Sequence, residues 1–218
     1  MKKVMIGIPS YDNKISTACT MSLIKTMKLL ADNEYQPVLV FSSGSLINRV
    51  RNDLVSNFID SDCDMFIFID SDISDFAESV LKMVQMQSSS IITIPYRKKQ
   101  EKEEYNTNLK YSIEETLYMC PDADIAEIKH GGTGCMLIPR CVLQTLISND
   151  NIKYIDDDKV KYNLFHSFVV DGKYLSEDYG FCHLCSLNNI KILALFDEIS
   201  HDGYKGNMYC YLMSIIFN

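Results

Sequence analysis

The chain has 218 residues, of which 47% are hydrophobic and 23% are charged, and its formal net charge is −8 at pH 7. This composition predicts one α/β-sized domain with a substantial core and excludes a disordered chain. The negative charge excludes a general nucleic-acid binder, because such proteins need a basic surface to displace counterions from phosphates.

The first part of the chain alternates short apolar strands with amphipathic helices. The pattern predicts strands at 4–8 and 37–41 and helices at 16–31 and 46–59, with Ser16 or Thr17 as the cap of the first helix. In the second helix the expected buried side is Ile47, Val50, Leu54 and Phe58, and the residues turned to another side are Asn48, Arg51 and Asn52. Such alternation with short connections predicts an α/β fold with a mostly parallel central sheet flanked by helices.

The clearest strand is 65–69, an apolar run rich in Phe and Ile that ends abruptly in Asp70, Ser71 and Asp72. It is typical of a buried central strand that reaches the surface at its carboxyl end. Open α/β sheets bind ligands at that edge, and two carboxylates there attract a divalent cation. The alternative is a solvated turn that merely closes the strand.

A helix at 75–87 and a strand at 90–95 complete a nucleotide-binding half, residues 1–95, of a single domain whose second half is 96–218. The charged run 96–105 is either a solvated loop or a flap over substrate. The elements expected beyond it are an antiparallel strand pair at 109–113 and 125–129, a strand at 135–138, helices at 139–147 and 176–188, a strand at 190–196, a loop at 200–205 and a terminal helix. The glycines at 131–134 match neither a Walker loop nor a G-x-G-x-x-G motif.

The eight cysteines are expected to be reduced and mostly buried, because their contexts are apolar and Pro9 ends the first apolar run too early for a secretory leader. Cys182 and Cys185 form a Cys-x-x-Cys pair with no second pair at zinc-site spacing, so we expect them in the core. No apolar run approaches the ~20 residues of a membrane span.

The order of the polar motifs resembles the GT-A class of nucleotide-sugar glycosyltransferases and, more faintly, the small glycosyltransferases of large DNA viruses of algae and amoebae. The resemblance spans nearly the whole chain. Its motifs are an Ile-Pro-Ser-Tyr end to the first strand, the segment 48–52 on the second helix, the Asp-Ser-Asp at 70–72, a glycine-rich stretch before Met136, the Glu177-Asp178 pair and a late His201.

The resemblance implies a GT-A fold and transfer of a sugar from a nucleoside diphosphate donor, expected to be a UDP-sugar, to a hydroxyl of a glycan or glycoprotein acceptor. A hard cation on the diphosphate stabilises the charge that grows on this leaving group. Asp70, Asp72 and His201 are the expected ligands of Mn²⁺ or Mg²⁺. In the resemblance the first Asp lies near the ribose and the second holds the metal. A satisfied surface histidine is the alternative for His201.

The nucleotide is expected to contact the ends of the first and central strands. Tyr11 stacks on the base while the backbone of Pro9 and Ser10 meets its edge, or Tyr11 packs against the sheet edge instead. Ser71 lies between the two aspartates of the motif and is expected beside the nucleotide.

Three further side chains are candidate donor ligands. Arg51 and Asn52 are expected to contact phosphate, ribose or the Asp70 carboxylate, with a surface ion pair as the alternative. Lys205 resembles the lysine of an H-x-x-G-x-x-K segment in some retaining GT-A enzymes, which contacts the diphosphate, but here each spacing is one residue shorter.

Glu177 and Asp178 match the acid pair of inverting GT-A enzymes, in which the Asp deprotonates the acceptor hydroxyl. The alternative is helix electrostatics, because acids are favoured in any first turn. If the enzyme retains configuration, Asp178 would position the acceptor instead.

Two other function classes are kept open. A D-x-D phosphatase of the haloacid dehalogenase type uses an aspartate after a strand as nucleophile, but on the first strand, and here that strand ends in Pro-Ser-Tyr. A non-catalytic nucleotide-sugar-binding module is the other. The expected location is the cytoplasm, that of the host if the chain is viral.

Overall fold

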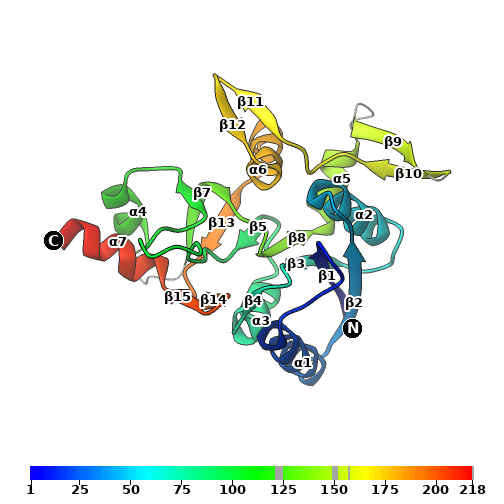
Figure 1. Ribbon diagram of the computed structural model, residues 1–218, viewed down its shortest axis with the longest axis horizontal. Helices are drawn as coiled ribbons and strands as arrows, with labels where there is room; N and C mark the ends of the chain where they lie inside the picture. Colours follow the sequence, from blue (N-terminus) through cyan, green and yellow to red (C-terminus); the bar gives the residue numbers. More distant parts are fainter. Residues whose placement is uncertain (121–124, 149–151, 157, 218) are drawn as a thin grey trace.

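An eight-stranded sheet with the strand order β2-β1-β3-β8-β5-β13-β7-β6 runs through the centre of the molecule (Figure 1). The computed structural model describes residues 1–120, 125–148, 152–156 and 158–217. The sheet strands are β1 Lys2–Ser10, β2 Tyr35–Ser43, β3 Met65–Ile69, β5 Ile91–Thr93, β6 Thr107–Leu109, β7 Ile125–Gly131, β8 Cys135–Pro139 and β13 Ile192–Leu195. The helices described are α1 Thr17–Asp32, α2 Ile47–Ile59, α3 Ala77–Gln85, α4 Ile113–Met119, α5 Arg140–Ile147, α6 Glu177–Leu187 and α7 Met208–Phe217. The α/β class predicted from the sequence is confirmed.

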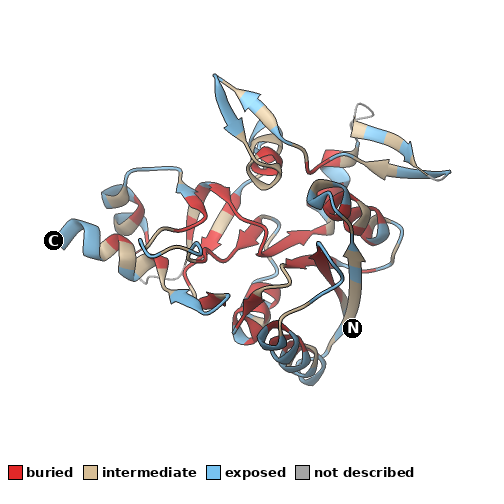
Figure 2. Cartoon of the chain, in the orientation of Figure 1, coloured by how far each residue is buried: buried red, intermediate tan, exposed pale blue. Residues whose placement is uncertain are grey.

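The sheet separates two apolar cores because successive side chains of a strand point to opposite faces. Phe66 and Phe68 of β3 enter the core that is covered by α2, α5 and α6. Ile67 and Ile69 enter the other core, which is covered by α1 and α3. Figure 2 shows the buried residues concentrated along these central strands. β3 is therefore buried on both faces, as its uninterrupted apolar run predicts.

The sheet is mixed, whereas the sequence predicted a mostly parallel one. β1 pairs in parallel with β2 and β3, and β5 pairs in parallel with β13. β8 is antiparallel to both β3 and β5, and β7 is antiparallel to β13. β7 and β8, which the glycine stretch 131–134 joins, therefore run in the same direction, with β13 and β5 between them in the sheet.

Smaller sheets lie around the central one. A three-stranded sheet combines β15 Tyr204–Gly206, β14 Ile199–His201 and β4 Ile73–Ser74, so the segment 200–205 forms the turn and strands of a hairpin rather than the predicted loop. Two hairpins project from the body (Figure 1): β9 Lys153–Asp156 with β10 Lys159–Tyr162, and β11 Phe168–Val170 with β12 Lys173–Leu175. The pairing of β14 with β4 brings the end of the chain beside the turn that follows β3.

Two local predictions are corrected by the structure. The segment 109–113, expected to be a strand, ends β6 and begins α4, because Ser112 and Glu115 form a capping box that starts a helix. Ile47, expected to be buried, is 36% exposed, whereas Arg51 and Asn52 are 5% and 3% exposed. The buried side of α2 therefore includes two polar residues.

All eight cysteines are free thiols, and six of them are buried. Cys182 and Cys185 lie in the core under α6, as predicted. In the described part of the chain, no helix has the length and apolar character needed to cross a membrane.

Arg140, the first residue of α5, ties this helix to the end of α2. Its Nε donates to the Cys63 carbonyl at 2.6 Å, and its Nη2 donates to the carbonyls of Phe58 and Ser61 at 2.9 and 3.0 Å. The guanidinium also lies 4.3 Å from the centre of the Phe58 ring. A cation is favourable here because the last carbonyls of a helix carry partial negative charge.

We expect Arg140→Met to lower the free energy of unfolding by about 2 kcal/mol, because the carbonyls at the end of α2 and of Ser61 and Cys63 lose a charged donor. Urea denaturation measures this. Lys82→Met is the control, since its ion pair with Asp197 is largely exposed, and it should change stability by no more than about 0.5 kcal/mol. Equal effects of the two substitutions would contradict the role assigned to Arg140.

Candidate functional site

The site begins with an ion pair between Arg51 of α2 and Asp70, the first residue after β3. Nη1 and Nη2 of Arg51 lie 3.0 and 3.4 Å from the two carboxylate oxygens of Asp70, and Nε lies 3.6 Å from Oε1 of Glu177 in α6. The guanidinium stacks 5.5 Å from the centre of the Phe68 ring, and its side chain is 6% exposed. Burial lowers the pKa of Arg51, but the charges of Asp70 and Glu177 raise this pKa by more than burial lowers it. The guanidinium therefore stays charged. The contact of Arg51 with the Asp70 carboxylate, one of the contacts predicted for Arg51 from the sequence, is confirmed.

Asp72 lies in a second cluster with His201. Backbone pairing of β14 with β4 places His201 opposite Ile73, next to Asp72. The Nδ1 atom of His201 is 3.0 Å from the carbonyl oxygen of Arg97, and Nε2 is 3.5 Å from Oδ2 of Asp72. A carbonyl oxygen only accepts hydrogen bonds, so Nδ1 donates to Arg97 and Nε2 is the ring nitrogen that faces Asp72.

Lys99 of the segment 96–105 reaches the same carboxylate. Its Nζ lies 2.6 Å from Oδ2 of Asp72 and 3.1 Å from Oδ2 of Asp202. Burial raises the pKa of Asp72, but the hydrogen bonds and charges of His201 and Lys99 outweigh it and hold that pKa well below its usual range. Asp72 is therefore a charged carboxylate that already holds a cation, the ammonium of Lys99.

The donor set at Asp72 fits a hard divalent cation. Asp72 supplies a carboxylate oxygen and His201 an imidazole nitrogen, a combination that suits Mn²⁺ as well as Mg²⁺. Over the residues that the structure describes, no group of three or more His, Cys, Asp or Glu side chains is arranged to hold a metal. A cation at this pair would take its other ligands from water and a bound diphosphate, as Mg²⁺ commonly does.

The structure separates Asp70 from the metal ligands expected with it. The paired oxygens of Asp70 face the guanidinium of Arg51, whereas the carboxylate of Asp72 faces His201 and Lys99. The reason is local, because the turn after β3 directs the two side chains toward different elements. The predicted group of Asp70, Asp72 and His201 is thus reduced to Asp72 and His201.

Tyr96 and Asn106 complete the floor of the site, and sequence reasoning missed both. A Cβ on Gly132 would lie 1.8 Å from Nδ2 of Asn106 and 2.9 Å from the hydroxyl of Tyr96, so only glycine allows this close approach. The Gly134 carbonyl accepts from the Asp70 amide at 3.0 Å, which joins the glycine stretch to the motif. Nδ2 of Asn106 is buried without a hydrogen-bond partner among the described residues. Tyr96 and Asn106 lie at the two ends of the charged run 96–105, and the sequence contains no other signal that points to them as site residues.

Glu177 and Asp178 occupy the first turn of α6 and face the same site. Glu177 lies against Arg51, while Oδ1 of Asp178 accepts hydrogen bonds from the Ser176 hydroxyl and, at 2.8 Å, from the Tyr179 amide. Burial, followed by the charges of Asp70 and Asp178, raises the pKa of the Tyr96 hydroxyl well above its usual range. Asp178 of α6 and Asp70 after β3 therefore both act on one buried hydroxyl.

The predicted base-binding residues lie where β1 ends. Pro9 and Ser10 are buried, and the Ser10 carbonyl accepts from the Gly44 amide at 3.2 Å. Tyr11 is 73% exposed, so the alternative of a tyrosine packed on the sheet edge is wrong. Ser71 accepts from the Ser16 amide at 2.9 Å, which ties the motif to the cap of α1.

Two predicted donor ligands have other roles in the structure. Oδ1 of Asn52 accepts from the amides of Leu164 and Phe165 at 3.0 and 2.8 Å, and its Nδ2 donates to Asn163 and to the Phe165 carbonyl. All its hydrogen-bonding capacity is used to hold the segment 163–165. Nζ of Lys205 lies 2.6 Å from Asp75. The lysine that reaches Asp72 is Lys99, which the sequence marked only as part of a possible flap.

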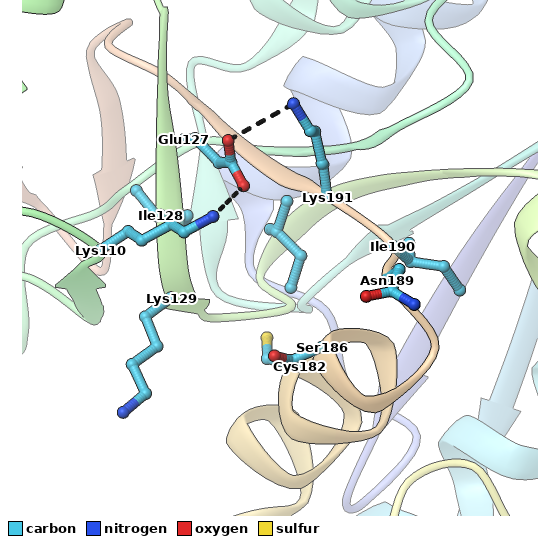
Figure 3. Close-up of a pocket in the computed structure, with 10 residues that line it drawn as sticks. Lys110, Glu127, Ile128, Lys129, Cys182, Ser186, Asn189, Ile190 and Lys191 are labelled. Carbon is cyan, nitrogen blue, oxygen red and sulfur yellow. Dashed lines mark hydrogen bonds and ion pairs between the residues drawn. The ribbon is translucent and has the colours of Figure 1, made fainter.

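The cavity of about 490 Å³ in Figure 3 lies elsewhere. It is lined by the residues that precede β13 and by Cys182 and Ser186 of α6, and Lys110 and Lys191 flank Glu127 there. Because β13 points in the same direction as β3, this is the opposite edge of the sheet from Asp70. No predicted site residue lines it.

Comparison with known proteins adds little to this picture. No family model matches the chain, and no curated protein matches it. The chain is similar to A197 from STIV, a crystal structure, with 16% sequence identity and a TM-score of 0.49 over 92% of this chain and 85% of that one. The functional argument therefore depends on the residues of this chain.

We expect Asn52→Ala to lower the free energy of unfolding by about 2 to 3 kcal/mol, because two buried amides and a buried carbonyl lose their partner. Urea denaturation tests this. Asn57→Ala, at an exposed position of the same helix, is the control and should alter stability by less than about 0.5 kcal/mol. If Asn52→Ala left stability unchanged and weakened nucleotide binding instead, Asn52 would be a ligand after all.

Proposed function

We propose that the chain is a metal-dependent glycosyltransferase of the GT-A type, which moves a sugar from a nucleoside diphosphate sugar, a UDP-sugar in our proposal, to a hydroxyl of a glycan or glycoprotein. The observation that supports it is that the two aspartates after β3 have different partners. Arg51 holds Asp70 with two contacts, while Asp72 faces His201 and a cationic group. One carboxylate is thus positioned rigidly and the other is available to a cation.

The donor would lie across the carboxyl ends of β1 and β3. Exposed Tyr11 offers a ring on which a uracil stacks. Asp70, fixed by Arg51, keeps lone pairs for ribose hydroxyls. Asp72 and His201 would hold Mn²⁺ or Mg²⁺, whose charge stabilises the diphosphate as it leaves.

Asp178 is our candidate for the base that deprotonates the acceptor hydroxyl. The Ser176 hydroxyl and the Tyr179 amide fix its Oδ1, and in the described part of the chain Oδ2 accepts no hydrogen bond. A fixed base with one free oxygen is suited to take a proton from a bound hydroxyl. A cavity of about 560 Å³ between the start of α2 and β9, lined in part by Asn48, offers space for an acceptor one helical turn from Arg51. A cytoplasmic location belongs to the same proposal.

Asp72→Asn tests the donor site. For the wild type we expect UDP and Mn²⁺ together to raise the melting temperature by more than either one alone, because a ligand selective for the folded state stabilises it. Asp72→Asn should lose this stabilisation. Asp75→Asn is the control, since Asp75 lies three residues away with a φ of 62° that Asn also adopts readily. A thermal-shift assay measures all three proteins.

Other results would favour the rival functions. Release of phosphate from a generic ester, trapped by beryllium fluoride, would indicate a phosphatase. UDP-sugar binding without any release of UDP, in the presence of candidate acceptors or water, would indicate a binding module. Equal loss of stabilisation in Asp72→Asn and Asp75→Asn would contradict the cation site.

Asp178→Asn tests the catalytic role. We expect it to lower the rate of UDP release from the donor by about 100-fold or more, because a general base contributes about that much, while UDP and Mn²⁺ still raise the melting temperature. Asp171→Asn, in the exposed turn between β11 and β12, should leave both properties unchanged. An undiminished rate in Asp178→Asn would restrict this residue to stabilising the start of α6.

A further inference from the structure

We propose that Lys99 is an internal counter-ion that holds the cation site closed and is displaced when a divalent cation binds to Asp72. This inference rests on the proposed function for the identity of the donor, but its chemistry is that of a divalent cation alone. It assigns the segment 96–105 a regulatory role at the site.

The contacts of Lys99 place its ammonium where a metal ion would be held. Nζ lies 2.6 Å from Oδ2 of Asp72, the same oxygen that lies 3.5 Å from Nε2 of His201. Asp202 lies on its other side at 3.1 Å, and the Asp202 amide donates to the Asp72 carbonyl at 3.0 Å. Two carboxylates thus hold one ammonium group, and the imidazole of His201 lies beside one of these carboxylates.

The ammonium and a metal ion exclude each other at this oxygen. Mn²⁺ or Mg²⁺ bound to Asp72 would lie about 2.1 Å from the ligand oxygen, well inside the hydrogen-bond distance of Lys99. Two like charges at such a separation repel strongly. Cation binding at Asp72 therefore requires the ammonium of Lys99 to leave.

The backbone around Lys99 limits how far the displaced side chain moves. Arg97 and Tyr105 form a β-bridge, and the Lys98 amide donates to the Glu104 carbonyl at 2.8 Å. The Arg97 carbonyl is also bonded to His201. These contacts hold the base of the segment at the site, and Lys99 is the residue of its tip, 99–103, that contacts Asp72 and Asp202. The released ammonium then stays within reach of an anionic diphosphate on the cation.

A Mn²⁺ titration of the full chain, without nucleotide, tests the competition. The electron paramagnetic resonance signal of free Mn²⁺ reports binding directly. We expect Lys99→Met to bind Mn²⁺ about twofold to fivefold more tightly than the wild type, because the loss of a partly exposed ion pair changes an equilibrium by about that factor. Asp72→Asn should abolish the high-affinity site in either background.

Lys205→Met is the matched control. It removes the same charge from β15, where Lys205 pairs with Asp75 at 2.6 Å, the same distance as in the pair of Lys99 with Asp72, and is somewhat more exposed. If the loss of any positive charge near the site were enough to strengthen Mn²⁺ binding, both variants would bind Mn²⁺ more tightly than the wild type. Equal tightening in Lys99→Met and Lys205→Met, or no tightening in Lys99→Met, would overturn the proposal, as would absence of Mn²⁺ binding to the wild type and Lys99→Met.

Trypsin gives an independent readout, because Lys98, Lys99 and Lys102 are cleavage sites in the segment. Mn²⁺ should speed cleavage of the wild type within 98–102. Lys99→Met should be cleaved at Lys98 and Lys102 at a rate that does not depend on Mn²⁺. Slower cleavage of the wild type with Mn²⁺ would overturn the proposal.

If Lys99→Met binds Mn²⁺ more tightly and UDP still fails to bind, the proposed function fails while this inference stands.

Discussion

The buried ion pair between Arg51 and Asp70 is the constraint on which the site depends. A guanidinium that is 6% exposed in its side chain is tolerated only when carboxylates compensate for its lost hydration. Asp70 and Glu177 do so from two different elements, the turn after β3 and the first turn of α6. One charge thereby fixes α2, the central strand and α6 relative to one another.

This pairing makes the two aspartates of the motif chemically unequal. Asp70 is held by a partner that stays charged, so its position is rigid and its charge is largely compensated. Asp72 is compensated by an ammonium on a long flexible chain and by an imidazole, both of which exchange for other ligands more readily. Of the two carboxylates, Asp72 is therefore the one suited to hold a cation.

The surrounding segments serve this arrangement by close packing. Gly132 lets Asn106 and Tyr96 approach the backbone that leads into β8, and the Gly134 carbonyl holds the Asp70 amide. The side-chain amide of Asn52 uses its hydrogen bonds to hold the segment 163–165, so this residue shapes the site without offering a group to a ligand. Of the buried polar residues of α2, Arg51 thus orients a charge and Asn52 holds a loop.

The sequence by itself determined the features that depend on neighbouring residues. These are the buried strand β3 with its acidic end, the capped helix α1 and the acid pair at the start of α6, because propensity, capping and apolar patterning act over a few residues. Only the tertiary structure decided which side chains meet. Arg51 finds Asp70 across 19 positions, Lys99 finds Asp72 across 27, and Asn52 finds Phe165 across 113. Such contacts depend on how the sheet and its connections pack, which local patterns do not encode.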